Sequence, residues 1–284
     1  MRFRLIALLM AAASMPAAGI TPPDRPGASD AAMSPDPNGA RPMAAADTFW
    51  IEQMTWMEVR DALRSGKSTV IIPTGGVEQN GPYLVTGKHN VILRATAEAT
   101  ARKLGDALVA PIVPFVPEGE IDPPSGSMRY PGTITVEAST FEALLRDIAR
   151  SMKTHGFKTI VFIGDSGGNQ QGMHDVAERL NKAWAGSGTR ALFVPEYYDW
   201  PGRQKWLAAR GYREIDQGFH DELAAETIML SVDPESVRMK QRIAAGNFSV
   251  NGVALAPAGM SIASGKALVD HIADLTSTAI RKRR

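Results

Sequence analysis

The 284-residue sequence contains no cysteine. This absence excludes disulfide bonds, thiolate zinc sites and thiol nucleophiles, so any metal ion would need His, Asp or Glu ligands. A strong basic excess is also lacking, because 31 Lys and Arg residues face 30 Asp and Glu residues. Nucleic-acid-binding domains usually carry such an excess, so nucleic acid is not an expected partner. The basic residues 281–284 are expected to form a frayed, solvated end.

The chain also lacks an apolar run long enough to span a bilayer. Its first apolar stretch, residues 5–15, follows a basic start that contains Arg2 and Arg4 and precedes several small residues. This order is typical of a secretory signal peptide. We therefore expect a signal peptide over residues 1–19, a secreted, periplasmic protein, and no stable membrane insertion after cleavage. An uncleaved anchor is the alternative.

Residues 20–47 are rich in Pro, Gly, Ala and Asp and show no apolar periodicity. Such a composition is typical of a disordered segment. The remaining residues are numerous enough to bury a sizeable core. We therefore predict a disordered leader over residues 20–47 and a single α/β domain over residues 48–284.

Strand-like and helix-like segments alternate along this domain. A first short helix is expected at residues 55–63, with Thr55 as its N-cap. Strands separated by helices require crossover connections, so the pattern predicts a central, largely parallel sheet flanked by helices in three layers. The expected strands are 69–73, 108–113, 159–163 and 190–194, and the further expected helices are 91–104, 140–155, 173–185 and 219–230.

Two glycine-rich segments follow predicted strands, where ligands of parallel sheets bind. Glu78 lies in the first and Asp165 in the second. A third polar segment contains His220, and Glu222 and Glu226 are spaced to share one helix face. Ordinary connecting loops and a solvated acidic helix are the simpler alternatives. A second alternative takes Ser166 as a nucleophile, with Asp216 or Asp233 as the acid and His271 as the base.

Together, and in this order, these segments resemble the creatininase family. The resemblance covers residues 55–231 and depends on residues 78–82, 130–133 and 167–169, followed by His220 and Glu226. It implies a parallel α/β fold, homo-oligomerisation, and metal-dependent hydrolysis of a C–N bond in a small amide. The expected partner is therefore a small-molecule amide substrate.

Several positions depart from the family's usual pattern. The family usually has His at the position of Asn80, Asp at the position of His89, and His at the position of Ser166. The resemblance therefore implies a rebuilt metal site, with one or two Zn²⁺, Mn²⁺ or Fe²⁺ ions per chain. Its expected ligands are Glu78, His89, Asp165, and Glu226 or Glu222.

The resemblance also suggests roles for the neighbouring residues. His220 is expected to donate a proton to the departing nitrogen, with Glu78 as its catalytic partner. Backbone N–H groups at Gly167 and Gly168 are expected to hold the oxyanion. Asn80 and Asn169 are expected to orient the substrate. A non-catalytic exported small-molecule-binding or assembly protein on the same fold is the alternative of another class.

Overall fold

The computed structural model describes residues 35–284, so the predicted signal peptide and the first part of the predicted leader lie outside the described residues. The chain divides into two compact units, Met1–Pro42 and Met43–Arg284. In the described part of the first unit, Gly39 N donates to Asp36 O over 3.1 Å and closes a turn. The second unit contains the sheet and all the sites discussed below.

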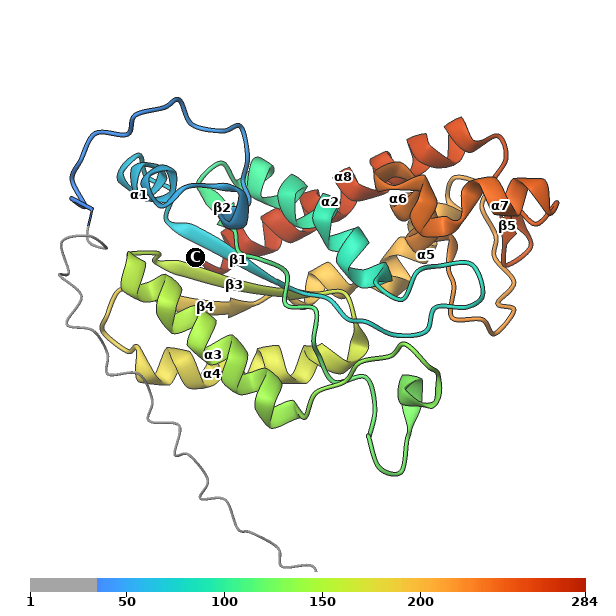
Figure 1. The fold of residues 1–284 in the computed structure, drawn as a ribbon, viewed down its shortest axis with the longest axis horizontal. Helices are drawn as coiled ribbons and strands as arrows, with labels where there is room; N and C mark the ends of the chain where they lie inside the picture. The colour runs from blue at the N-terminus through green and yellow to red at the C-terminus, as the bar shows by residue number, and fades with distance from the viewer. Residues whose placement is uncertain (1–34) are drawn as a thin grey trace, which may run out of the picture. The chain divides into compact units, whose positions relative to one another are not determined.

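Four parallel strands form the centre of the second unit (Figure 1). Every residue of the two central strands is buried, which explains why both strands are apolar runs. In the register of this pair, Thr69 lies opposite Thr159 and Thr74 lies opposite Gly164. The strands, in their order across the sheet, are β2 (Ala107–Val109), β1 (Thr69–Thr74), β3 (Thr159–Gly164) and β4 (Arg190–Phe193).

Helices cover both faces of this sheet, as Figure 1 shows. Ile71 and Val161 point to one face, where they pack with α2 (Lys88–Leu104), α6 (Leu223–Val232) and α8 (Ala258–Arg283). The alternate residues Ile72 and Phe162 point to the other face and pack with α3 (Ala138–His155) and α4 (Gln170–Ala183). The three-layer, parallel α/β fold predicted from the sequence is confirmed.

Shorter elements complete the unit. They are the helices α1 (Trp56–Arg64), α5 (Trp200–Ala208) and α7 (Met239–Ala244), and the antiparallel pair β5 (Ser249–Val250) and β6 (Val253–Ala254). Single 3₁₀ turns lie at η2 (Ile51–Gln53), η3 (Gly126–Arg129), η4 (Gly167–Asn169), η5 (Pro195–Tyr198) and η6 (Pro234–Val237). None of the helices among residues 35–284 has the length and apolar character needed to cross a membrane.

Some local predictions are confirmed and others need correction. The capping box at Thr55 is present, since Glu58 N donates to Thr55 Oγ1 over 3.3 Å and Thr55 N donates to Glu58 Oε2 over 2.6 Å. The helix predicted from residue 219 begins only at Leu223, because His220 has a left-handed φ of 65°. The basic end predicted to be frayed and solvated is largely exposed, continues α8 as far as Arg283, and places Arg284 Nη1 3.0 Å from Asp106 Oδ2.

Candidate active site

The carboxyl ends of β1 and β3 bring three charged side chains together. Glu78 lies in the loop after β1, Asp165 directly follows β3, and His89 occupies the first turn of α2. All three are buried. Because parallel neighbours end at the same edge of a sheet, residues far apart in sequence meet here. The structure thus assembles three of the four side chains predicted as ligands.

His89 links the two carboxylates. Its Nε2 lies 2.7 Å from Glu78 Oε1, and its Nδ1 lies 3.0 Å from Asp165 Oδ2. Burial by itself would lower the pKa of His89, but the hydrogen bonds to Asp165 and Glu78 outweigh it and raise this pKa. Burial raises the pKa of Glu78, but interactions led by the hydrogen bond with His89 overcome this and bring it down to about 2. These shifts favour the charged forms, an imidazolium ion between two carboxylates.

The outer oxygens of the two carboxylates are also occupied. Ser127 Oγ donates to Glu78 Oε2 over 2.6 Å. Arg203 Nη1 donates to Asp165 Oδ1 over 3.3 Å, and Arg203 Nη2 donates to Tyr197 O over 2.7 Å. Arg203 is buried in α5 and was not identified from the sequence, because nothing within α5 indicates a buried cation. Its guanidinium counters the buried charge of Asp165.

Glu118 is a further buried acid at this site that sequence reasoning missed. It lies in the irregular segment between β2 and α3, where no motif or periodicity marks it. Ser166 Oγ donates to Glu118 Oε2 over 3.3 Å, whereas Glu118 Oε1 has no partner among the described residues. Burial first, and the charge of Glu78 second, raise the pKa of Glu118 to about 8. Glu118 is therefore mainly protonated at neutral pH.

His220, in the segment between α5 and α6, lies beside the same cluster. Its Nε2 lies 3.8 Å from Glu78 Oε1, and its Nδ1 lies 3.0 Å from Gln79 O. Burial and the charge of the neighbouring Lys88 lower the pKa of His220, so the neutral ring is favoured near pH 7. The buried Lys88 donates from Nζ to His220 O over 3.4 Å. This contact fixes the backbone of His220 beside Glu78.

The two asparagines predicted to orient a substrate donate hydrogen bonds to the backbone of the loops. Asn80 Nδ2 donates to Glu78 O over 2.9 Å and lies within 3.4 Å of Val85 O and Thr86 O. Asn169 Nδ2 donates to Thr74 O and Gly75 O over 3.1 and 3.2 Å. Both side chains are buried, and their N–H groups position the loops. Asn80 Oδ1 has no hydrogen-bond partner among the described residues, so the role in orienting a substrate stays a prediction.

Close packing explains one of the two glycines predicted at the oxyanion position. A Cβ atom at Gly168 would lie only 2.0 Å from Pro117 O. Gly168 therefore lets the segment that carries Glu118 approach the turn η4 and places the Glu118 carboxyl against Ser166. At Gly167 a Cβ atom would lie 3.3 Å from the hydroxyl of Tyr198.

The remaining predicted residues form no hydrogen bond or ion pair with Glu78, His89 or Asp165 in the part of the chain that the structure describes. Glu226 Oε2 forms a buried ion pair with Arg242 Nη1 at 2.5 Å. Glu222 does not share a helix face with Glu226, because it is the extended residue before α6. Ser166 hydrogen-bonds Glu118, whereas the ring of His271 stacks on Trp206. The structure therefore does not assemble the alternative serine site.

The predicted ligands do not fit a metal centre in this arrangement. Both nitrogens of His89 face carboxylates, both oxygens of Asp165 are paired, and Glu226 is held by Arg242. Among residues 35–284, no three His, Asp or Glu side chains are grouped so as to hold one ion. The ligand assignment stays a prediction.

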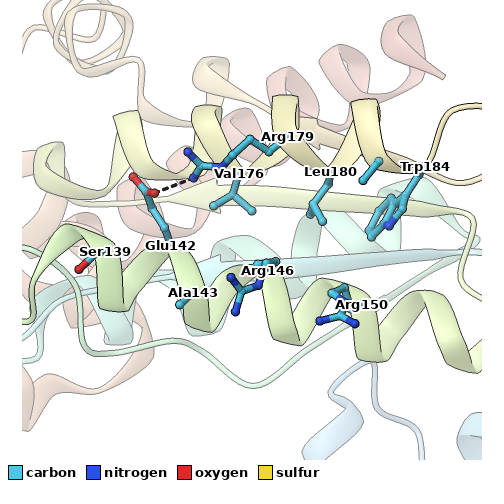
Figure 2. A pocket seen from close by; sticks show the side chains of 10 residues that line it. Ser139, Glu142, Ala143, Arg146, Arg150, Val176, Arg179, Leu180 and Trp184 are labelled. Carbon is cyan, nitrogen blue, oxygen red and sulfur yellow. Dashed lines mark hydrogen bonds and ion pairs between the residues drawn. The ribbon is translucent and has the colours of Figure 1, made fainter.

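A cavity of about 460 Å³ lies between α3 and α4, in the helix layer on the other face of the sheet from α2 (Figure 2). Apolar side chains such as Val176 and Leu180 line it together with charged residues. Arg179 Nη2 reaches Glu142 Oε2 at 2.6 Å, the ion pair drawn in Figure 2. Glu142 lies far in the chain from the buried acid–base cluster and is already paired, so its substitution serves as a control.

The fold and the site define a parallel α/β protein with a buried acid–base cluster at the carboxyl edge of its sheet. A family model described as creatinine amidohydrolase matches residues 52–280. The chain belongs to the creatininase family, a family of metal-dependent amidohydrolases.

Known relatives agree with this assignment. The chain is 22% identical to the creatinine amidohydrolase of Pseudomonas putida over 198 residues, which cover 67% of this chain and 74% of the relative. It is 29% identical to a mycofactocin precursor peptide peptidase of Mycolicibacterium smegmatis over 139 residues, 47% of this chain and 53% of the relative. A solved structure titled "Creatininase Mn" shares the fold, with a TM-score of 0.62, 18% identity, and coverage of 83% and 98% of the two chains.

Proposed function

We propose that the chain hydrolyses a C–N bond of a small amide at the carboxyl edge of β1 and β3, with His220 and Glu118 as its base and acid. The observation that carries this proposal is that both groups reach the buried cluster. His220 Nε2 lies 3.8 Å from Glu78 Oε1. Glu118 approaches His89 across Gly76, where a Cβ atom would lie 2.3 Å from Glu118 Oε1 and 3.2 Å from His89 Cδ2. The names of two relatives, an amidohydrolase and a peptidase, support a reaction at an amide bond.

The chemistry follows from the protonation states. Neutral His220 takes a proton from water, and the resulting hydroxide attacks the amide carbonyl carbon. Glu118 donates its proton to the departing nitrogen as the C–N bond breaks. The proton on His220 then restores the acid form of Glu118 through solvent. Each turnover therefore adds one water molecule across the bond.

Glu78 stabilises the positive charge that forms at the site during this cycle. Its carboxylate stabilises the imidazolium that forms on His220, 3.8 Å away. His89, itself held by Asp165, is hydrogen-bonded to one oxygen of Glu78. Ser127 donates to the other oxygen. The buried network therefore acts as a rigid support for the reacting groups.

Hydrolysis by the chelator-treated protein is the direct test. Creatinine, hydantoin and short peptides serve as substrates, with chromatographic detection of the products. His220→Asn and Glu118→Gln should each lower kcat/KM by about 100-fold or more, whereas the control Glu142→Gln should not change it. Activity that requires added Mn²⁺ or Zn²⁺ would replace this mechanism with a metal-dependent one.

A non-catalytic binding protein is the second candidate. It is favoured by the internal pairing of Glu78, His89, Asp165 and Arg203, which leaves these charges compensated without a substrate. Binding of the same compounds without product formation would select it.

We also propose that the protein is exported to the periplasm and forms a homo-oligomer. Cell fractionation tests the first proposal, and light scattering tests the second.

A further inference from the structure

A cavity of about 480 Å³ lies beside the candidate active site and has an acidic lining. Four carboxylates line it, from the segment between α5 and α6, together with His220 and the turn residue Asn251. The carboxylates are Glu214, Asp216, Asp221 and Glu222.

Three of these carboxylates have a buried oxygen without a hydrogen-bond partner among the described residues. These atoms are Glu214 Oε2, Asp221 Oδ1 and Glu222 Oε2. Asp221 is only 4% exposed. Most buried polar atoms in folded proteins are hydrogen-bonded, and an unpaired carboxylate oxygen is especially unfavourable. Three such atoms around one cavity indicate that hydrogen-bond donors belong there.

The side chain of Asn251 and the backbone N–H of Leu223 hold these groups in position around the cavity. Asn251 Nδ2 donates to Glu214 Oε1 over 3.1 Å and to Asp221 O over 3.0 Å. Leu223 N donates to the same Glu214 oxygen over 2.7 Å. These bonds occupy one oxygen of Glu214 and leave its other oxygen unpaired. The arrangement is therefore built by the fold, and a flexible acidic surface would not produce it.

The fixed cations nearby are already engaged elsewhere. Lys88 donates to His220 O, Arg203 to Asp165, and Arg242 to Glu226. They lower the pKa values of Asp221 and Glu222, but burial is the larger effect, and both pKa values are raised. Residues 35–284 therefore supply no hydrogen-bond donor to the three unpaired oxygens.

We propose that this cavity binds a small organic cation, an alkylammonium or alkylguanidinium ion, whose N–H groups donate to Glu214, Asp221 and Glu222. An organic cation suits the site better than a metal ion, since no three acidic or His side chains in the described part of the chain converge on one point. N–H donors spread over several ångströms can reach separated carboxylates. This binding does not depend on the proposed hydrolysis.

Calorimetric titration of the intact protein tests the proposal with propylammonium and methylguanidinium chlorides as probes. Methylurea provides an uncharged control, and tetramethylammonium provides a cation without N–H donors. At least one of the two probes should bind, and both controls should bind much more weakly. Asp221→Asn and Glu214→Gln should each weaken probe binding by about 10- to 100-fold.

A matched substitution separates this effect from a general loss of acidity. Glu142→Gln removes one carboxylate from the other cavity (Figure 2) and should leave probe binding unchanged. Thermal unfolding of each variant checks that it is folded. The proposal is overturned if neither probe binds, if methylurea or tetramethylammonium binds equally well, or if folded Asp221→Asn and Glu214→Gln retain full affinity.

Discussion

The ring of His89 stands between two buried carboxylates, 2.7 Å from Glu78 Oε1 and 3.0 Å from Asp165 Oδ2. The family resemblance places an acid at the position of His89, so the sign of the charge is reversed at this point of the site. Together with Arg203, which pairs with Asp165, the ring compensates both carboxylates from within the protein. The cluster thus forms a closed ion-pair network instead of an open set of ligands.

Removing the ring should be strongly destabilising. In His89→Asn, Glu78 and Asp165 lose the charge between them while they remain buried, and breaking such a pair costs about 3–5 kcal/mol. Urea unfolding near pH 6 should show this loss. His174→Asn is the control, because that ring pairs with Asp175 on an exposed surface and should change stability by less than about 1 kcal/mol. Equal losses in the two variants would contradict the ion-pair network.

The stabilising effect of His89 should depend on pH. Its pKa is raised in the folded state, so its contribution is complete below the ordinary value of 6.5 and is lost as pH rises through the folded pKa. The pKa of Glu78 is lowered to about 2, so its contribution is present above 4.5 and is lost as pH falls toward 2. The stability difference between wild type and His89→Asn should therefore be largest between about pH 4.5 and 6.5. Unfolding curves across this range check it, and a difference that grows toward pH 9 would contradict it.

Glu118 should make the protein less stable as pH rises. Its folded pKa of about 8 lies above the ordinary 4.5, so the folded state binds more protons between these values. Glu118→Gln removes this proton linkage, and its stability relative to wild type should increase from pH 5 to pH 8. Denaturant unfolding at several pH values measures the change. The exposed substitution Glu120→Gln should show no such trend, and a similar trend in both variants would exclude Glu118 as its source.

The sheet edge could be predicted from sequence because its strands are short apolar runs that end in glycine-rich turns. Glu78 and Asp165 follow such runs, so their meeting follows from the topology alone. Glu118 and Arg203 could not be predicted in the same way. One lies in an irregular segment and the other in a short helix, and only tertiary packing places their charges at the site.

The C-terminal helix α8 was missed for a related reason. Gly259 and Gly265 interrupt its sequence, and glycine lowers helix propensity. In the fold, a Cβ atom at Gly265 would lie 1.9 Å from Thr227 O, so this glycine allows the close approach of α8 to α6. The low helix propensity of glycine therefore opposes the helix, but the close packing of α8 on α6 requires glycine at this position, and the packing decides the structure.

The pH dependence of hydrolysis should follow the proposed acid and base. The pKa of His220 is lowered, so the acid limb of kcat/KM should lie below pH 6.5. The pKa of Glu118 is about 8, so activity should fall again above that pH. Glu118→Gln should lose the alkaline limb together with most of the rate. An alkaline limb that persists in this variant would assign the acid to another group.

Gly168 should be required for the approach of Glu118 to the site. In Gly168→Ala the new methyl group would meet Pro117 O at 2.0 Å, so the backbone must shift, at a cost of about 1–3 kcal/mol. Because that shift moves the adjacent Glu118 away from Ser166, kcat/KM should fall as well. Gly259→Ala is the matched control, since no atom lies within 4 Å of its Cβ position in α8 and the change should stabilise the protein by about 0.4–1 kcal/mol. Unfolding and activity assays of both variants measure these effects, and a fully active, equally stable Gly168→Ala protein would show that this contact does not position Glu118.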